Sequence, residues 1–537
     1  GHSLLATQLA SRIRKSWRRE LSLRKVFEHP VLHRLAATLQ VHGMPARSGP
    51  VFAPAGRHGD RRPLSHAQQR LWFLWKLEPA SAAFNIPAAF SLKGRLDPEA
   101  LRFAFQQLVE RHEVLRTVFR EEDGQGWQSI QDAFVPEESI IDFAAVQEAL
   151  QGDRVQQLVD DQTRQPFDLE RGPLLRISLI RLAADSHLMV VVMHHIVTDG
   201  WSIRLMMSEF VRSYAARLDG RTPELPALGI QYADFAAEQR RWLDAGEMER
   251  QLAYWKGKLA GVAPLVLPPD KPMPARRMHP GGAASLSLDA RATAALRKLA
   301  QAHDATPFMV LLAVFAIVAS ERSGQSAFFV GTDTANRNRE ETEALVGFFV
   351  NQLALAIDCA ATLSLSELLA QVRSTVADAS DHQDLPFDRL VESIRVGRRS
   401  GRAPLFQVKV IYQEDAGASF VLPGLEVADH PVGAKEAELD LIVAFIAAED
   451  HVEVSLKYDR EVFEDSSIES LGQEMVAVLR ACVADPSARI GALRAVAANV
   501  QSAASARTAH ERTRRLAGLR SALKPRTAPL ARQPSQS

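Results

Sequence analysis

The chain has 537 residues, a length that favours two to four folding units over one small core. Lysine plus arginine and aspartate plus glutamate both number 64, so no overall field directs the chain to nucleic acid or to an anionic membrane. The two cysteines, Cys359 and Cys482, lie far apart and predict no disulfide framework, which suits a reducing cytoplasm. The chain begins with glycine and shows no signal peptide, so we expect a piece of a longer cytoplasmic polypeptide.

The first 42 residues predict a small helical fragment, in which apolar residues recur at helical spacing as far as Ile13. Its apolar surface is too small for the fragment to fold stably alone. Ser3, in the run GHSLL, has the side chain of a helix N-cap. Residues 43–62 are rich in Gly, Pro, Arg and Ala without apolar periodicity, which predicts a linker.

Two amphipathic helices are predicted next, over 63–79 and 98–109. The segment 111–119, RHEVLRTVF, then runs into a strand. If Arg116 is buried it needs a carboxylate, because an unpaired internal charge is costly, and Asp199 is one candidate. The alternative is a solvated arginine at the start of a strand.

The stretch 187–218 combines a strand, a turn and a helix. Residues 187–193 form a valine-rich apolar run of strand length, and Asp199 and Gly200 then break the pattern with turn residues. From Trp201 onward apolar residues recur at helical spacing. The loop between the strand and the helix is a place where a rigid scaffold can hold reactive groups and leave them reachable.

This loop carries the pattern HHxxxDG, which makes His194, His195, Asp199 and Gly200 the candidate catalytic residues. The imidazole of His195 can take a proton from an attacking nucleophile or hold that nucleophile in line. Adjacent residues of an extended chain point opposite ways, which favours a structural, hydrogen-bonding role for His194 over a catalytic one. Asp199 either pairs with an arginine or caps the following helix.

Other chemistries do not fit the spacing of these residues. A zinc site of the HExxH type needs two histidines one helical turn apart, whereas these two are adjacent. No GxSxG nucleophile elbow occurs, and no Walker loop or GxGxxG follows a predicted strand. We therefore expect neither a metal nor a bound nucleotide.

Strand and helix signals continue to alternate in the second half. A long amphipathic helix is predicted over 232–259 and a proline-dense crossing loop over 265–280. Residues 326–331 predict a strand that leads into GTDTANR, where Asn336 and Arg337 can offer donors to a substrate or pair with a carboxylate. A bare surface turn is the alternative. Further helices are expected at 292–303, 306–321 and 468–483, and further strands at 284–288 and within 440–458.

Two other segments carry a composition signal. The apolar run 308–320 is too short to span a bilayer and predicts a core helix. In 499–537 basic residues outnumber acidic ones eight to one, and disorder is the default expectation. The alternative is a basic helix over 510–523 that docks onto another polypeptide.

At least six ordered motifs resemble those of the condensation domains of nonribosomal peptide synthetases. They are SHAQQRLWFL from Ser65, RHEVLRTVF from Arg111, HHIVTDGWS from His194, YADF from Tyr232, GTDTANR from Gly331, VGFFVN from Val346 and HQDLPF from His382. The resemblance runs from about Pro63 to Leu493. It implies an α/β (α+β) fold with two lobes, each like chloramphenicol acetyltransferase, in a V-shaped pseudo-dimer with a tunnel between them.

The resemblance also divides the chain. We expect the two lobes at 63–238 and 239–497, followed by a basic tail at 498–537 that is disordered or docks. Residues 1–42 resemble the C-terminal part of a peptidyl carrier domain. In that family the serine of GGHSL, here Ser3, carries a 4′-phosphopantetheine arm.

The function implied is amide formation between a donor thioester on an upstream carrier domain and the amine of an acceptor on a downstream one. A thioester is already activated, so no ATP or metal is needed. His195 would accept the proton of the amine, and amide groups near Gly200 and Trp201 could stabilise the oxyanion. Asp199 would hold the loop by pairing with Arg116 or with Arg337.

Three alternatives stay open at this point. Epimerisation domains share HHxxxDG but continue DGxSW, whereas this chain has Trp201 and Ser202 after Gly200, the condensing pattern. Ester formation onto a hydroxyl would use the same histidine, and a non-catalytic docking module would use none. We expect a monomer without nucleic-acid or membrane partners, whose acceptor carrier can arrive on another polypeptide through the C-terminal tail.

Overall fold

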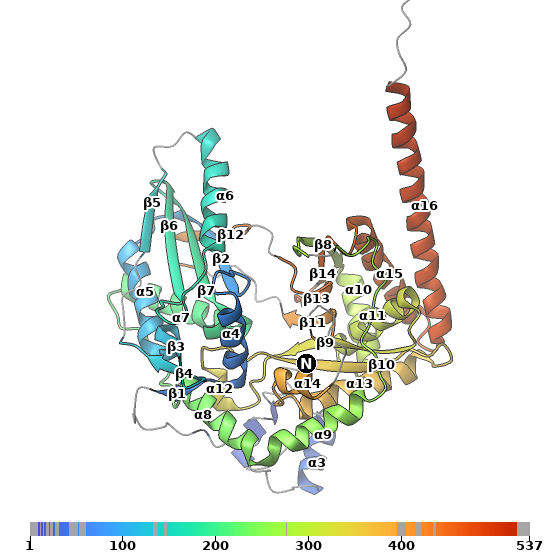
Figure 1. The fold of residues 1–537 in the computed structure, drawn as a ribbon, viewed down its shortest axis with the longest axis horizontal. Helices are drawn as coiled ribbons and strands as arrows, with labels where there is room; N and C mark the ends of the chain where they lie inside the picture. The colour runs from blue at the N-terminus through green and yellow to red at the C-terminus, as the bar shows by residue number, and fades with distance from the viewer. Residues whose placement is uncertain are drawn as a thin grey trace, which may run out of the picture.

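The computed structural model of the protein describes residues 61–522 except 133–137, 144–147, 275–276, 395–403, 415–420 and 433–435, together with helix α3 (Leu32–Val41) and scattered residues before 61. Two α/β lobes splay apart in a V (Figure 1), and the predicted two-lobed α/β fold is confirmed. Ser3 lies outside the described residues, so the carrier fragment predicted around it stays a prediction.

The first lobe is built on a five-stranded sheet of order β12-β2-β7-β6-β5. Its strands are β2 (Asn85–Gly94), β5 (Glu138–Asp142), β6 (Leu175–Ala183), β7 (Ser186–His194) and β12 (Leu425–Asp429). Its helices are α4 (His66–Leu77), α5 (Pro98–Arg111), α6 (Glu148–Arg164) and α7 (Gly200–Leu218). A small sheet is formed by β1 (Arg62–Pro63), β4 (Gln125–Ile130) and β3 (Thr117–Glu122), which follows the short helix η1 (Glu113–Arg116).

Strand β7 lies at the centre of this sheet, hydrogen-bonded to β2 on one side and β6 on the other. All its residues from His187 to His194 are buried, which explains why the sequence reads as a continuous apolar run rather than an alternating one. The chain then passes through one short turn, η2 (His195–Val197), into α7. The predicted order of strand, loop and helix is confirmed.

The second lobe has a six-stranded sheet of order β10-β9-β11-β13-β14-β8. Its strands are β8 (Gly281–Leu288), β9 (Ala327–Thr334), β10 (Asn351–Asp358), β11 (Val408–Glu414), β13 (Leu441–Ala447) and β14 (Val452–Asp459). Its helices are α10 (Ala290–Ala302), α11 (Pro307–Ser323), α12 (Glu340–Glu343), α13 (Leu365–Asp381), α14 (Phe387–Ser393) and α15 (Asp465–Ala484).

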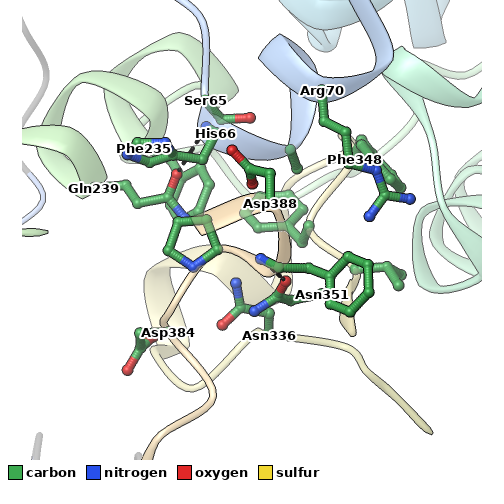
Figure 2. A pocket seen from close by; sticks show the side chains of 15 residues that line it. Ser65, His66, Arg70, Phe235, Gln239, Asn336, Phe348, Asn351, Asp384 and Asp388 are labelled. Atoms are coloured by element: carbon green, nitrogen blue, oxygen red, sulfur yellow. Dashed lines mark hydrogen bonds between the residues drawn. The ribbon is translucent and has the colours of Figure 1, made fainter. Parts of the chain in front are cut away.

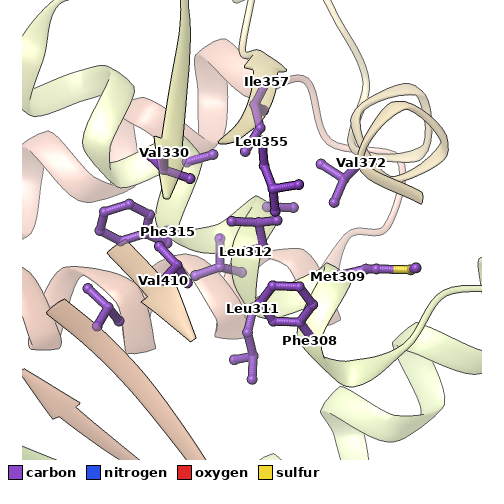
Figure 3. Close-up of a cluster of buried hydrophobic side chains, with 14 of the residues drawn as sticks. Phe308, Met309, Leu311, Leu312, Phe315, Val330, Leu355, Ile357, Val372 and Val410 are labelled. Atoms are coloured by element: carbon purple, nitrogen blue, oxygen red, sulfur yellow. The ribbon is translucent and has the colours of Figure 1, made fainter. Parts of the chain in front are cut away.

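Helix α11 is the core of this lobe. It begins at the cap of Thr306, with Pro307 in its first turn, and ends at Gly324 in the left-handed conformation (φ 71°). Every residue from Phe308 to Ser320 is buried, and Figure 3 shows the helix packed among side chains of β9, β10, β11 and α13. The predicted core helix is confirmed. In the described part of the chain no single helix is long and apolar enough to cross a membrane, although the bent pair α10–α11 passes that test by length and composition.

The helix predicted over 232–259 is broken into two. Helices α8 (Tyr232–Trp242) and α9 (Met248–Leu259) are joined by the π-helical turn η3 (Leu243–Glu247). Gly246 adopts φ 105° there, a conformation that costs a glycine little. The periodicity of the apolar residues continues across the break, so the sequence pattern does not show it.

The C-terminal tail also differs from its default expectation. Helix α16 runs from Ile490 to Ala522, so the chain from 499 to 522 is helical rather than disordered. Alanine and arginine make up 11 of the 24 residues of this segment and have high helix propensity, which outweighs its charge. The predicted docking role of the tail stays a prediction.

The second half of the chain contributes segments to the first lobe. Strand β12, from the second half of the chain, pairs with β2 and extends the sheet of the first lobe. Leu345, Val346, Phe348 and Phe349 are buried in the hydrophobic core of the first lobe, although they follow β9 in sequence. The second half of the chain is therefore anchored in the first lobe at two places.

A substitution at Gly347 tests whether this segment packs against the first lobe in this way. A Cβ at this position would lie 1.9 Å from Cδ2 of Tyr232, a buried residue on α8. We expect Gly347→Ala to lower the free energy of unfolding by about 3 kcal/mol or more, because the overlap cannot be relieved without moving one of the two segments. Urea denaturation measures this. The matched control is Gly257→Ala, which has open space around the new methyl group and should leave stability unchanged or slightly raised. Equal stability of the two variants would contradict the packing.

Candidate active site

The side chain of His195 is fixed by its own loop. Its amide donates to the carbonyl of Phe84, which directly precedes β2, at 2.8 Å. Its Nδ1 lies 2.6 Å from the carbonyl oxygen of Thr198. A carbonyl can only accept, so Nδ1 carries the proton and Nε2 is left with a free lone pair. His195 is thus held in the tautomer of a base.

The surroundings of His195 keep it neutral. Its ring centroid lies 4.5 Å from that of Phe348, and the residue is half-buried. Burial lowers the pKa of His195 below 6.5, while the hydrogen bond to Thr198 and the negative charge of Asp199 oppose this shift. The neutral form is therefore present at neutral pH.

His194 points away from His195 and has a structural environment. Its Nδ1 accepts a hydrogen bond from the amide of Ile196 at 3.1 Å, and its ring packs against Phe84 and Phe167. Burial, with a smaller effect of His195, lowers the pKa of His194 to about 3. This geometry supports the structural alternative for His194, and a catalytic role for it stays a prediction.

Asp199 both caps the helix and pairs with an arginine. Its Oδ1 accepts from the amide of Ser202 at 2.8 Å, from Ser202 Oγ at 2.7 Å and from Arg337 at 3.2 Å. Its Oδ2 accepts from the amide of Phe349 at 3.0 Å. The sequence left open whether Asp199 caps the helix or pairs with an arginine, and its carboxylate does both.

Arg337 is the partner of Asp199, and Arg116 is not. The Arg337 guanidinium is completely buried, donates to the carbonyls of Thr342 and Leu345, and lies over the ring of Phe349. These contacts support the pairing role of Arg337, and a role as donor to a substrate stays a prediction. Arg116 instead forms an ion pair with Glu113 at 3.6 Å and donates to the carbonyl of Gln131.

Trp201 and Ser202 join the start of α7 to the second half of the chain. Trp201 Nε1 donates to the carbonyl of Glu343 at 2.9 Å. Ser202 Oγ lies 2.9 Å from the carbonyl oxygen and 3.0 Å from the amide nitrogen of Gly347. Both residues support the position of the loop.

Gly200 leaves space at the helix N-terminus. A Cβ on this residue would meet no atom within 4 Å. The first amides of an α-helix have no intrahelical acceptor, and those of Gly200 and Trp201 are the first two of α7. Together with the helix dipole they form a site that favours a developing negative charge.

A polar pocket of about 420 Å³, including its open mouth, lies at the junction of the lobes (Figure 2), and Phe348, whose ring contacts His195, is one of its lining residues. His66 and Asn336 line it, and both ring nitrogens of His66 and Oδ1 of Asn336 are buried without a partner among the described residues. Burial, with smaller effects of nearby arginines, lowers the pKa of His66 to about 4, and burial raises the pKa of Asp388. Such groups can bind water or a polar chain.

The sequence did not point to all of these residues. The second position of the motif SHAQ is unspecified, so His66 gave no signal, and the backbone role of Thr198 cannot be read from its side chain. Phe348 belongs to the motif VGFFVN, but nothing in its spacing places it against His195. Within the described part of the chain no three His, Cys, Asp or Glu side chains gather as metal ligands would.

Comparison with known proteins finds matches over most of the chain. A family model described as the condensation domain matches residues 59–502. One of the subunits of linear gramicidin synthase from Brevibacillus parabrevis is 39% identical over 500 residues, which are 92% of this chain and 6% of that protein. The chain spans only 6–10% of the length of the linear gramicidin synthase subunits that it matches.

Solved structures share the fold. The X-domain from teicoplanin biosynthesis superposes with a TM-score of 0.73 at 29% identity, over 82% of this chain and 99% of that one. Holo-AB3403, a four-domain nonribosomal peptide synthetase bound to AMP and glycine, gives a TM-score of 0.71 at 26% identity, over 83% of this chain and 34% of that one. The X-domain has also been solved in a complex with OxyB.

The buried pair of Asp199 and Arg337 predicts a stability effect. We expect Asp199→Asn to lower the free energy of unfolding by about 3–5 kcal/mol, because it leaves the buried guanidinium without a counter-charge. Chemical denaturation measures this. Glu392→Gln is the control, since its pair with Arg389 is exposed and should contribute almost nothing. An Asp199→Asn variant as stable as the control would contradict the assigned pairing.

Proposed function

The chain belongs to the condensation domain family of nonribosomal peptide synthetases, and we propose that it forms an amide bond between two carrier-bound substrates. Members of this family are acyl-transferring enzymes. The observation that carries the proposal is the hydrogen bond between His195 Nδ1 and the carbonyl of Thr198, which leaves Nε2 as the proton acceptor.

The proposed reaction has one addition and one elimination. The acceptor amine attacks the thioester carbonyl, forming the C–N bond, and Nε2 of His195 takes the amine proton. The amides at the start of α7 stabilise the oxyanion. The C–S bond then breaks, and the leaving thiolate takes the proton from His195 as a thiol. The walls of the active site contribute by holding the amine and the thioester carbonyl close together in a water-poor space.

The proposed partners are an upstream donor carrier and a downstream acceptor carrier, each with its substrate on a 4′-phosphopantetheine arm. Residues 1–42 supply the end of one such carrier, with Ser3 as the attachment residue, and the C-terminal tail is a candidate contact for a partner in trans. This chain matches small parts of much longer synthetases over 92% of its own length, which supports this arrangement. The proposal also holds that the polypeptide is monomeric and cytoplasmic.

A second candidate is a docking module without catalysis. The observation that favours it is the structural similarity to the X-domain, which was solved in a complex with OxyB. An ester product or epimerisation of the donor would use the same histidine. The complete arrangement of His195, Thr198, Asp199 and Arg337 favours catalysis over docking, because docking needs no base tautomer.

Transfer between carriers tests the proposal. Intact-mass measurement of an acceptor carrier, mixed with a loaded donor carrier and the protein, should show acyl transfer that falls by about 10²-fold or more in His195→Ala. The control is His451→Ala, because the partly exposed His451 has no side-chain partner among the described residues other than its neighbour Asp450. Equal transfer by both variants would assign His195 a structural role. If neither protein transfers the acyl group, an inverted configuration of the donor would favour epimerisation. Recruitment of another protein to the carrier would favour the docking module.

The pH dependence follows from the lowered pKa of His195. The reaction needs the neutral imidazole, so the rate should be constant from pH 8 to about 6.5 and fall only in more acidic buffer, as protonation becomes significant below the usual histidine value. The substitution Phe348→Ala exposes the imidazole of His195 to water. Its pKa, and with it the pH at which the rate falls, should therefore move upward, toward about 6.5. If the rate of the wild-type protein already falls at a pH above the usual histidine pKa, this would contradict the buried environment assigned to His195.

A further inference from the structure

Lys409 is a buried cation that the proposed mechanism does not use. It lies on β11, and its side chain is only 7% exposed. Its Nζ lies 3.0 Å from Oδ2 of Asp333, on the neighbouring strand β9, and 3.9 Å from Oε2 of Glu438. Burial alone would lower the pKa of Lys409, but attraction to Asp333 and Glu438 raises it. The ammonium group therefore holds the carboxylate of Asp333 in place through one of its two oxygens.

This ion pair lies on the face of the second sheet that turns away from the core helix. Val330 on β9 and Val410 on β11 pack with α11 (Figure 3). Successive side chains of a strand point to opposite faces, so Lys409, next to Val410, lies on the other face. Lys409 is in register with Gly331, two residues before Asp333. The side chains of Lys409 and Asp333 therefore share that other face.

The same face is turned toward the His195 loop of the first lobe. Burial lowers the pKa of His195, and the charges of Glu438 and Asp333 are among those that oppose this shift. The same two acids attract the guanidinium of Arg70, which lies on α4 and lines the pocket at the lobe junction (Figure 2). Asp333 is thus close enough for its charge to act on the proposed base, although it belongs to the other lobe.

One oxygen of Asp333 has no partner. Oδ2 contacts Lys409, whereas Oδ1 is buried without a hydrogen-bond donor among the described residues. A buried carboxylate oxygen is costly unless a donor reaches it. The proposed reaction brings such a donor, because the attacking amine carries two N–H groups and Nε2 of His195 takes the proton of only one.

We infer that Oδ1 of Asp333 accepts a hydrogen bond from the second N–H of the attacking amine and so selects an amine over a hydroxyl. The inference rests on the proposed function and names a further residue for it. After the attack the nitrogen carries two hydrogens and a positive charge. One proton passes to His195, and the other hydrogen stays on the amide nitrogen, bonded to Asp333. A hydroxyl has one hydrogen, which His195 takes, so only its lone pairs face the carboxylate and they are repelled.

Paired acceptors test the inference. The alanyl and lactyl thioesters of N-acetylcysteamine differ only in an amine against a hydroxyl, and each is offered to the full chain with a donor carrier loaded with N-acetylalanine. Mass spectrometry follows the loss of the acyl group from the carrier. In Asp333→Ala, kcat/KM for the alanyl acceptor should fall about 10- to 100-fold, the loss expected for one hydrogen bond to a charged group, while the value for the lactyl acceptor should stay unchanged or rise.

Two further variants separate this role from a structural one. Asp333→Ala leaves the buried Lys409 without its nearest counter-charge, so the double variant Asp333→Ala/Lys409→Met removes both partners and should show the same selective loss in a stable protein. Glu438→Gln is the matched control. Its carboxylate attracts the same lysine, but its side chain is 70% exposed, so the ratio of amine to hydroxyl transfer should change by less than about threefold.

Binding adds a readout that needs no turnover. In titration calorimetry without a donor, the wild-type protein should bind the alanyl thioester about tenfold more tightly than the lactyl one, and Asp333→Ala should remove this difference. Equal losses for both acceptors, or a selective loss in Glu438→Gln alone, would overturn the role of Asp333 and leave the proposed amide formation intact. No transfer by the wild-type protein, with the preference in binding retained, would refute the reaction but not the site.

Discussion

The carboxylate of Asp199 is the interaction on which the rest of the site depends. It accepts from the amide and the hydroxyl of Ser202 in its own lobe, and from Arg337 and the amide of Phe349 in the second half of the chain. A buried carboxylate is stable only when such donors surround it. One side chain therefore fixes the start of α7, the position of the loop before it and the contact between the two halves.

The placement of His195 follows from this constraint. Because the cap begins α7 at Gly200, the carbonyl of Thr198 turns toward His195 Nδ1 and selects one tautomer. Because Phe349 is held by Asp199, its neighbour Phe348 is placed against the imidazole, where it also lines the polar pocket at the lobe junction. The proposed base and the proposed oxyanion site thus share one support, and we expect that weakening this support alters chemistry and stability together.

The sequence predicted local structure better than it predicted partners. Valine-rich β7 and amphipathic α7 follow from periodicity, and burial on all sides made α11 recognisable as a core helix. The choice between Arg116 and Arg337 could not be made, because both arginines are distant from Asp199 in the chain and pairing depends on the tertiary fold. From the sequence, the helix cap and the ion pair of Asp199 were alternatives, although one carboxylate has enough lone pairs to accept from both partners.

Other differences have similar causes. The break at Gly246 depends on one backbone conformation that periodicity does not record. The insertion of β12 into the sheet of the first lobe is a long-range pairing, and a strand of five residues gives no signal of which sheet it joins. In the tail, charge suggested disorder while residue propensity favoured a helix, and propensity prevailed as far as Ala522.

The most direct test of this account is the protonation state of His195 at neutral pH, measured by ¹⁵N NMR of the imidazole in the wild-type protein and in Arg337→Lys. The account predicts a neutral ring with the proton on Nδ1 in the wild type, and a mixture of tautomers in the variant, because lysine cannot reproduce the contacts that Arg337 makes with Asp199, Thr342 and Leu345. A wild-type ring that carries its proton on Nε2, or that is protonated on both nitrogens, would contradict it.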